Sequence, residues 1–483
     1  MVGVARSGGC HTCRRRRVGC DQRRPTCQRC EADGRVCEGY QRYAVFVNRT
    51  PEGLQRRQRL EEAILPGHVI PAGRQTHPAN VILADSNASG TAVTVAGDLD
   101  NAAARSLLDD FMIIYLPTAP GNRTGATLTW LKEAYGYSQP SLLLEVARNA
   151  LAANRVAAVS GDSSMQRIGH MYYGRALQAL TEQLNQQSEN RDDQVLEAVR
   201  CLMIYELFES TAASVSAWAS HQRGLVELLM KRGPANFEGD TSKALLIDIR
   251  AANVITSVQY SKSSPLASRE WQLGAPPTSL LEVEHRFCDL GLELSALSEQ
   301  NDTITSSSES NLEKDEKLVA EIDQRSLDLV ILLQQIEQFR PSTVSHDDLG
   351  FWNLETALHA ANIKVMMLDA SITTREIVGR SQPSASTVTA VTDKFTTEAE
   401  GVLASQILSA LEYTTGNNMG LYGAQKSLFA VRMMLCNLSR QDPLFDRFLK
   451  ILNRLAQRGL RHVQDLNNEW GQPGTLDRNR NAP

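Results

Sequence analysis

The chain has 483 residues, of which 42% are hydrophobic and 22% are charged, and its formal net charge is −5. This length gives room for a large core and roughly two to four domains. No apolar run approaches the ~18 residues of a membrane-spanning helix, so we expect no membrane span. The charge is uneven, because the first sixty residues hold fourteen arginines, no lysine and five acidic residues, which leaves −14 for the remainder. A basic head on an acidic body is typical of a nucleic-acid module tethered to a body that phosphate repels.

After residues 1–9, which we expect to be disordered, six of the nine cysteines fall within 28 residues. Each half of this segment has the spacing C-x2-C-x6-C, and every cysteine of the first half recurs 17 positions later. The six are Cys10, Cys13, Cys20, Cys27, Cys30 and Cys37. This duplication predicts a unit with pseudo-twofold symmetry. The segment is too short and too poor in apolar residues to fold around a core of its own.

Disulfide bonds, a redox site and a metal cluster compete as explanations for these cysteines. Disulfides are typical of small secreted chains, but we find no apolar secretion segment before Cys10. A redox C-x-x-C motif opens a helix in a βαβ setting, and no strand pattern surrounds this one. Metal binding fits best, because each C-x-x-C pair lets two thiolates hold one ion.

Six thiolates can complete two tetrahedral zinc sites only if two of them bridge, since two such sites need eight ligand positions. The duplication makes Cys10 and Cys27 the symmetric choice for the bridges. The sequence therefore predicts two zinc ions per chain, with Cys13, Cys20, Cys30 and Cys37 as terminal ligands.

The segment resembles the fungal binuclear zinc cluster transcription factors, whose six cysteine positions it matches throughout. The resemblance implies a Zn2Cys6 module in residues 10–40 that places a short helix in the major groove of double-stranded DNA. It further implies that Arg16 and Arg17 read bases, typically a CGG triplet, because a guanidinium can bond O6 and N7 of one guanine. Arg14, Arg15, Arg23 and Arg24 would contact phosphates and position the module.

Two other interpretations of the arginine run stay open on the sequence alone. Four consecutive arginines are also typical of a solvated basic face or a nuclear import signal. A zinc-stapled scaffold for protein–protein contacts, without DNA readout, is the alternative function. Such a scaffold would not require four consecutive arginines beside a zinc ligand, so the sequence favours DNA binding.

Residues 41–104 are predicted to form a linker. Only Leu54, Leu60 and Ile64 offer helical spacing before Pro66, which is too little for a dimerising zipper. A homodimer is therefore open and unsupported. The rest of the linker mixes small and polar residues without periodicity.

Residues 105–470 are predicted to form a large all-α domain, because helical periodicity recurs and no alternating strand pattern appears. One helix spans 141–159, a second carries Val195 and Val199, and a third starts near Trp218 and ends where Gly233 can cap it before Pro234. The remaining helices are expected near 242–259, 281–298, 314–339, 350–378, 394–414, 424–439 and 443–469, the last with Asp442 as its N-cap.

Two polar stretches, 299–313 and 379–393, are expected to be surface loops, and 471–483 a disordered tail. Isolated Cys201, Cys288 and Cys436 are expected to be buried free thiols.

The helical body is similar to the fungal-specific transcription factor domain, because Trp218–Pro234 resembles a sequence motif that recurs in that domain. His221 and Arg232 within that motif are predicted to be packing and capping residues. This resemblance implies a regulatory role for the domain, with the transcription machinery or its co-regulators as partners.

No catalytic motif accompanies these features: the sequence lacks HExxH, GxSxG, a Walker loop and GxGxxG. We therefore expect no enzyme. The sequence predicts a nuclear, sequence-specific regulator of RNA polymerase II-type transcription that binds DNA and no membrane.

Overall fold

A computed structural model divides the chain into two compact units, residues 1–58 and 59–483. The structure describes residues 10, 12–13, 16, 18–21, 23, 26–35, 37, 99, 101–118, 125–185, 193–209, 216–307, 312–339, 353–381 and 397–460. The predictions for the N-terminal residues, the linker before Leu99 and the C-terminal tail lie outside this part of the chain.

The described residues contain helices and no β-strand, which confirms the predicted small cysteine-rich head and large all-α domain. The head carries α2 (Gln28–Ala32). The α-helices of the second unit are α4 (Asn101–Tyr115), α5 (Ala126–Gly136), α6 (Leu142–Ser160), α7 (Ser163–Asn185), α8 (Asp193–Glu209), α9 (Ser216–Arg232), α10 (Gly239–Tyr260), α11 (Leu280–Ser307), α12 (Leu312–Ile336), α13 (Leu354–Ser381), α15 (Thr397–Thr414), α16 (Gly420–Asn437) and α17 (Phe445–Gln457). Short 3-10 turns are η2 (Pro234–Asn236), η3 (Pro265–Ala267), η4 (Arg269–Trp271), η5 (Glu337–Phe339) and η6 (Asn417–Met419).

Helix α6 is the centre of the first helical group and packs against α4, α7 and α8. Its sequence is rich in leucine and alanine, which form helices readily, and its side chains are buried over most of its circumference. The Ser141 hydroxyl caps its first turn by accepting a hydrogen bond from the Leu144 N–H, at 3.3 Å. A helix that is buried on most of its sides requires neighbours on those sides, and this explains its central place.

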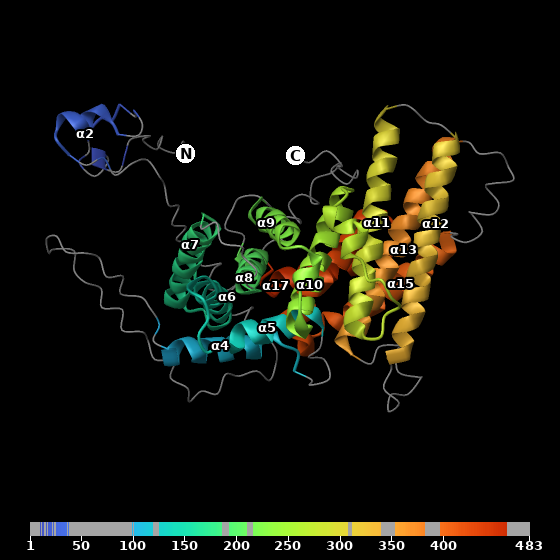
Figure 1. The fold of residues 1–483 in the computed structure, drawn as a ribbon, viewed down its shortest axis with the longest axis horizontal. Helices are drawn as coiled ribbons and strands as arrows, with labels where there is room; N and C mark the ends of the chain where they lie inside the picture. The colour runs from blue at the N-terminus through green and yellow to red at the C-terminus, as the bar shows by residue number, and fades with distance from the viewer. Residues whose placement is uncertain are drawn as a thin grey trace. The chain divides into compact units, whose positions relative to one another are not determined.

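The second group is a bundle in which α11, α12, α13 and α15 run side by side (Figure 1). Helix α10 links the two groups, because it packs on α5 and α9 as well as on α11. Helix α16 forms the second link through its contacts with α4, α13 and α15. Residues from both groups consequently share one continuous apolar core.

The close approach of α16 to the end of α4 depends on Gly420. Its φ of 63° lies in the left-handed region, and a Cβ at this position would lie 2.6 Å from the Leu116 carbonyl and closer still to the Tyr115 oxygen. Only glycine fits both the backbone conformation and this contact.

The end of α9 confirms a local prediction. Gly233 has φ 78°, and its N–H donates to the Leu229 carbonyl at 2.9 Å, directly before Pro234. The Arg232 guanidinium donates to the Asn236 carbonyl at 2.8 Å, and it also pairs with Asp193. Arg232 therefore ties the end of α9 to the turn that follows it and to α8, which is a structural role, as predicted, and not that of a ligand site.

The loop predicted at 299–313 was wrong over its first part, because α11 continues to Ser307. Asn301 is buried, and it accepts a hydrogen bond at 2.7 Å from Arg380 of α13. Arg380 also donates to Thr305 at 2.6 Å and pairs with Asp315 of α12. These contacts between helices outweigh the polar, serine-rich composition on which the loop prediction rested.

Two further expectations need correction. Helix α17 begins at Phe445 and ends at Gln457 instead of spanning 443–469, because Asp442 forms a turn with Leu444 and Gly459 takes φ 92°. Cys436 is exposed in the last turn of α16, whereas Cys201 and Cys288 are buried free thiols as predicted. Among the described residues, no helix is long and apolar enough to cross a membrane.

Candidate metal centre

The head is organised around sulfur atoms. Cys10, Cys13, Cys27 and Cys30 are fully buried, and Cys20 and Cys37 pack against them half-buried. The only other hydrophobic residue among the described ones of this cluster is Val18. Such a cluster supplies too little apolar burial to fold the segment without further help.

The thiols form two overlapping groups of four, and within each group the sulfurs lie within 4.8 Å of one another. One group holds Cys10, Cys13, Cys20 and Cys27, and the other holds Cys10, Cys27, Cys30 and Cys37. Both groups contain Cys10 and Cys27, whose sulfurs are 3.6 Å apart. Two tetrahedral ions that share two thiolates need this arrangement.

Backbone hydrogen bonds repeat with the same 17-residue offset as the cysteines. The Cys13 N–H points to the Cys10 sulfur at 3.4 Å, and the Cys30 N–H points to the Cys27 sulfur at 3.3 Å. Likewise, the Val18 N–H donates to the Cys13 carbonyl at 3.0 Å, and an equivalent bond of 2.9 Å follows Cys30. The sequence repeat is therefore also a repeat of local structure.

Asp21 fixes the second half of the repeat. Its carboxylate accepts hydrogen bonds from the N–H groups of Gln28, at 3.1 Å, and Arg29, at 3.2 Å, in the first turn of α2. These backbone bonds, the Gln28 bond first, lower the pKa of Asp21. An ionised carboxylate at this end also suits the helix dipole.

Two of the six predicted DNA-contacting arginines are described, and both face acidic side chains within the head. Arg16 forms an ion pair of 2.7 Å with Asp33, and Arg23 lies 3.4 Å from Glu31. The Asp33 position is 17 residues after Arg16, so the two members of this pair are equivalent in the repeat. Arg14, Arg15, Arg17 and Arg24 lie outside the described residues.

The thiol chemistry suits a metal cluster. Burial raises the pKa of the Cys30 thiol to about 12 and that of the Cys13 thiol still further. Bound zinc requires thiolates, so the ions would displace these protons on binding. Two groups of four convergent sulfurs thus fit two zinc ions, and the residues that would hold them are the six predicted cysteines.

The helical unit holds a buried polar centre that periodicity did not indicate. Asp248 of α10 is fully buried and accepts hydrogen bonds from the Arg200 guanidinium, at 2.7 Å, from the Trp130 indole, at 3.0 Å, and from Thr127. Lys426 of α16 lies 3.4 Å from the same carboxylate. Burial opposes ionisation of Asp248, but the two cations outweigh it and lower its pKa.

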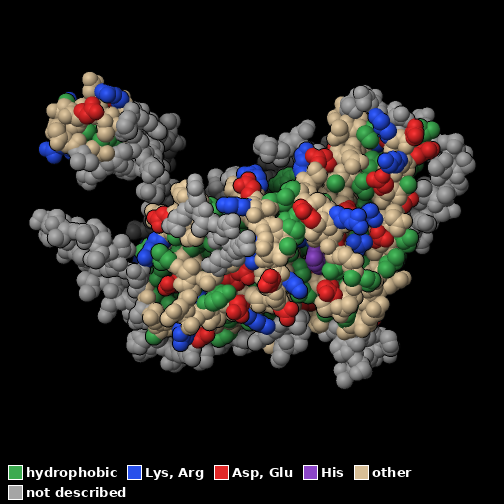
Figure 2. All heavy atoms as spheres, viewed as in Figure 1, with side chains coloured by type: hydrophobic (Ala, Val, Ile, Leu, Met, Phe, Trp, Pro, Cys, Tyr) green, Lys and Arg blue, Asp and Glu red, His purple; other side chains and the backbone are tan. Residues whose placement is uncertain are grey.

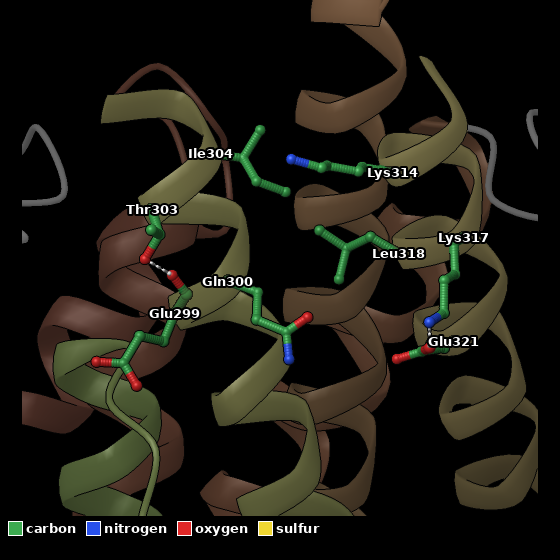
Figure 3. Close-up of a pocket in the computed structure, with 8 residues that line it drawn as sticks. All are labelled: Glu299, Gln300, Thr303, Ile304, Lys314, Lys317, Leu318 and Glu321. Carbon is green, nitrogen blue, oxygen red and sulfur yellow. Dashed lines mark hydrogen bonds and ion pairs between the residues drawn. The ribbon is translucent and has the colours of Figure 1, made fainter. Parts of the chain in front are cut away.

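A surface pocket of about 560 Å³ lies between the end of α11 and the start of α12. Figure 3 shows Ile304 and Lys314 extending toward one another from the two helices, and Lys317 directed to Glu321. Of the eight residues that line it, only Leu318 is buried. The pocket therefore offers no buried polar group that would select a particular ligand.

Comparison with known families agrees with the division of the chain into a cysteine-rich head and a large helical unit. A model described as the fungal Zn(2)-Cys(6) binuclear cluster domain matches residues 8–44, and one described as the fungal specific transcription factor domain matches residues 109–464. The chain belongs to the fungal specific transcription factor domain family. No solved structure matches it.

Curated relatives share only a short stretch with the chain. The aspercryptin biosynthesis cluster-specific transcription regulator atnN of Emericella nidulans is 62% identical over 32 residues, which are 7% of this chain and 5% of that protein. White-opaque regulator 2 of Candida albicans is 58% identical over 33 residues, 7% of each chain. An uncharacterized transcriptional regulatory protein of Schizosaccharomyces pombe is 38% identical over 74 residues, 14% of this chain and 13% of its own length.

The chain thus carries the domain of fungal specific transcription factors after a cysteine-rich head that is a binuclear cluster with two zinc ions. The family is one of regulators and not of enzymes, and its zinc cluster proteins are typically nuclear. The helical unit from α4 to α17 corresponds to the transcription factor domain.

Proposed function

We propose that the chain is a transcription regulator that acts in the nucleus on RNA polymerase II-type genes and binds a CGG-like triplet in double-stranded DNA through its zinc cluster. The observation that carries the proposal is the pair of sulfur groups sharing Cys10 and Cys27, set within an arginine-rich segment. All six cysteines serve as zinc ligands, with these two as bridges.

In this proposal the short helix that starts at Cys10 or Cys13 and carries the arginine run enters the major groove. Arg16 and Arg17 contact base edges, whereas Arg14, Arg15, Arg23 and Arg24 contact phosphates and set the register. Arg16 must exchange Asp33 for guanine on binding, because its guanidinium is bound to that carboxylate in the free head. This pair is partly exposed to solvent, so a bidentate guanine contact can replace it.

We further propose residues 10–40 as the DNA-binding domain, 41–104 as a linker and 105–470 as the regulatory domain that meets co-regulators. The charge of the regulatory domain supports this division of labour. On the face shown in Figure 2, the described acidic and basic side chains of the helical unit are intermixed, and they form no continuous basic surface for phosphate.

Selection of bound sequences from a random DNA pool, with the full chain, tests the proposal. We expect an enriched CGG-like triplet, and the number of triplets per site reports whether one chain or two bind. Affinity for the selected site should fall steeply with salt concentration, since each phosphate contact releases counterions.

Arginine variants separate base contacts from phosphate contacts. Arg17→Ala should cost about 1–3 kcal/mol on the selected site and relax base preference there. Arg23→Ala is the matched control: it should weaken binding about equally on all sequences and reduce the salt slope by about one. If Arg17→Ala instead weakens all sequences equally, Arg17 is a phosphate contact. A zinc-loaded chain that binds no DNA would favour the protein–protein scaffold.

A further inference from the structure

A second group of potential metal ligands lies inside the regulatory domain. Glu284 of α11 and Glu355 and His359 of α13 are all buried, and they bring one ligand atom each to within 4.8 Å of one another. Glu355 and His359 are four residues apart on one helix, so they lie on the same face. They are 71 and 75 residues from Glu284, so only the packing of α11 against α13 brings the three together.

Two of the atoms in this group have no hydrogen-bond partner. The Glu355 Oε1 atom accepts a hydrogen bond of 2.6 Å from the Tyr422 hydroxyl, but its Oε2 atom accepts none. The Nε2 atom of His359 also has none, and these two atoms are 3.8 Å apart. Buried polar atoms are nearly always satisfied, and each orphan costs about 1–3 kcal/mol. Two orphans that face each other point to a missing shared partner.

The local charge indicates a cation as that partner. The carboxylates here are Glu284, Glu355 and Asp248, and the nearby cations are Arg200 and Lys426. Lys426 contacts Glu284 at 3.1 Å and Asp248 at 3.4 Å, and Arg200 binds Asp248. Arg200 and Lys426 pair with Asp248 and Glu284, and neither cation contacts Glu355 within 4.0 Å. Burial therefore raises the pKa of the Glu355 carboxyl to about 8, and a divalent ion bound here would displace that proton.

We propose that Glu284, Glu355 and His359 bind one divalent metal ion of the zinc type within the regulatory domain. Two carboxylate oxygens and one imidazole nitrogen form a common ligand set for such an ion, with water in the fourth position. Tetrahedral bonds of about 2.0–2.2 Å place ligand atoms about 3.3–3.6 Å apart, close to the 3.8 Å between Glu355 Oε2 and His359 Nε2. Lys426 keeps Asp248 as its partner when Glu284 turns to the ion.

The metal content of the full-length chain tests this site. The chain is saturated with zinc, dialysed free of excess, and its bound zinc is counted by elemental analysis. His359→Gln and Glu355→Gln should each carry one zinc ion fewer than the unaltered chain. His170→Gln is the matched control, because its half-exposed imidazole on α7 lies outside the cluster, and it should carry the full number. Equal zinc content in His359→Gln and the unaltered chain, both folded by circular dichroism, overturns the proposal.

A second measurement needs no variant, in case a substitution prevents folding. The unaltered chain is stripped of metal and reloaded with cobalt, whose bonds to thiolates give charge-transfer bands that bonds to oxygen and nitrogen do not. We expect one bound cobalt ion per chain beyond those that the thiolate bands account for. If thiolate sites account for all the bound cobalt, the regulatory domain binds no metal and the orphaned Glu355 oxygen is satisfied by a proton. The cysteine cluster contributes the thiolate bands, so failure of this inference leaves the proposed DNA-binding function untouched.

Discussion

The two sulfur groups predict different zinc losses for bridging and terminal cysteines. Cys27 belongs to both groups, whereas Cys20 belongs only to the group that includes Cys13. Cys27→Ser should therefore remove two zinc ions and Cys20→Ser one. Each structural zinc contributes about 10–16 kcal/mol to folding at neutral pH. The loss of two therefore exceeds the roughly 5–15 kcal/mol by which whole domains are stable. Among the described residues of the head, only Val18 and the cysteines form its core.

Native mass spectrometry of the full chain counts the zinc ions, and fluorescence anisotropy with a labelled duplex measures DNA binding. Both variants should lose DNA binding, because Cys20 shapes the half of the head that carries the arginine run. Cys436→Ser is the control: this cysteine is exposed on α16, far along the chain from the cluster, and its loss should change neither quantity. If Cys27→Ser retains either of the two zinc ions, Cys27 is not a bridge and the shared-thiolate arrangement is refuted.

Three predictions concern the regulatory domain. Asp248→Ala should destabilise it by about 3–5 kcal/mol, because Arg200 would remain buried without its partner. Urea denaturation followed by the fluorescence of Trp130, whose indole bonds Asp248, measures the loss. An unchanged unfolding midpoint would contradict the role of Asp248 as the partner of Arg200. Gly420→Ala should lower the free energy of unfolding by about 1–3 kcal/mol through the positive φ of this position alone, and urea denaturation measures this change as well. Burial lowers the pKa of His221, so the imidazole binds a proton more readily in the unfolded chain than in the folded one. The free energy of unfolding should therefore fall as the pH drops below about 6.5, the ordinary pKa of histidine in an unfolded chain. His221→Gln should flatten this pH dependence, and an unaltered slope would show that His221 does not contribute.

The sequence predicted most helices because their stability is visible in local patterns. The end of α9 is an example, since Gly233 and Pro234 stop a helix whatever surrounds it. The cysteine head was predicted for the same reason: ligand spacing within 28 residues already limits how two metal ions can be held. In both cases the deciding residues are neighbours in the chain.

The prediction errors occurred where contacts between residues far apart in the sequence determine the local structure. Nothing near Asn301 in the sequence indicates that Arg380, 79 residues away, will bond to it and keep α11 helical. The polar centre around Asp248 was missed likewise, because Arg200, Asp248 and Lys426 come from three helices. Apolar periodicity reports which face of a helix is buried, but it cannot report which buried positions carry charge or what balances it. The spacing of Glu355 and His359 was the one local signal, and alone it did not distinguish a ligand pair from an ordinary helix face.

The repeat in the head also explains why only one half would face DNA. With an offset of 17 residues, the run Arg14, Arg15, Arg16, Arg17 corresponds to Glu31, Ala32, Asp33, Gly34. The two halves therefore share backbone hydrogen bonds and sulfur geometry but differ in electrostatic character. Under the proposed function, phosphate would favour the first half, because residues 10–20 carry four arginines and no acidic residue, whereas residues 27–37 carry two arginines and two acidic residues. Asp33 also holds Arg16 in the free head at 2.7 Å, which ties the arginine-rich half to the second half before DNA arrives. We expect Asp33→Asn to retain both zinc ions and to bind DNA more tightly, because it removes a competitor for Arg16 and a negative charge near the backbone. If the variant binds DNA more weakly at full zinc content, Asp33 instead positions Arg16 for the groove.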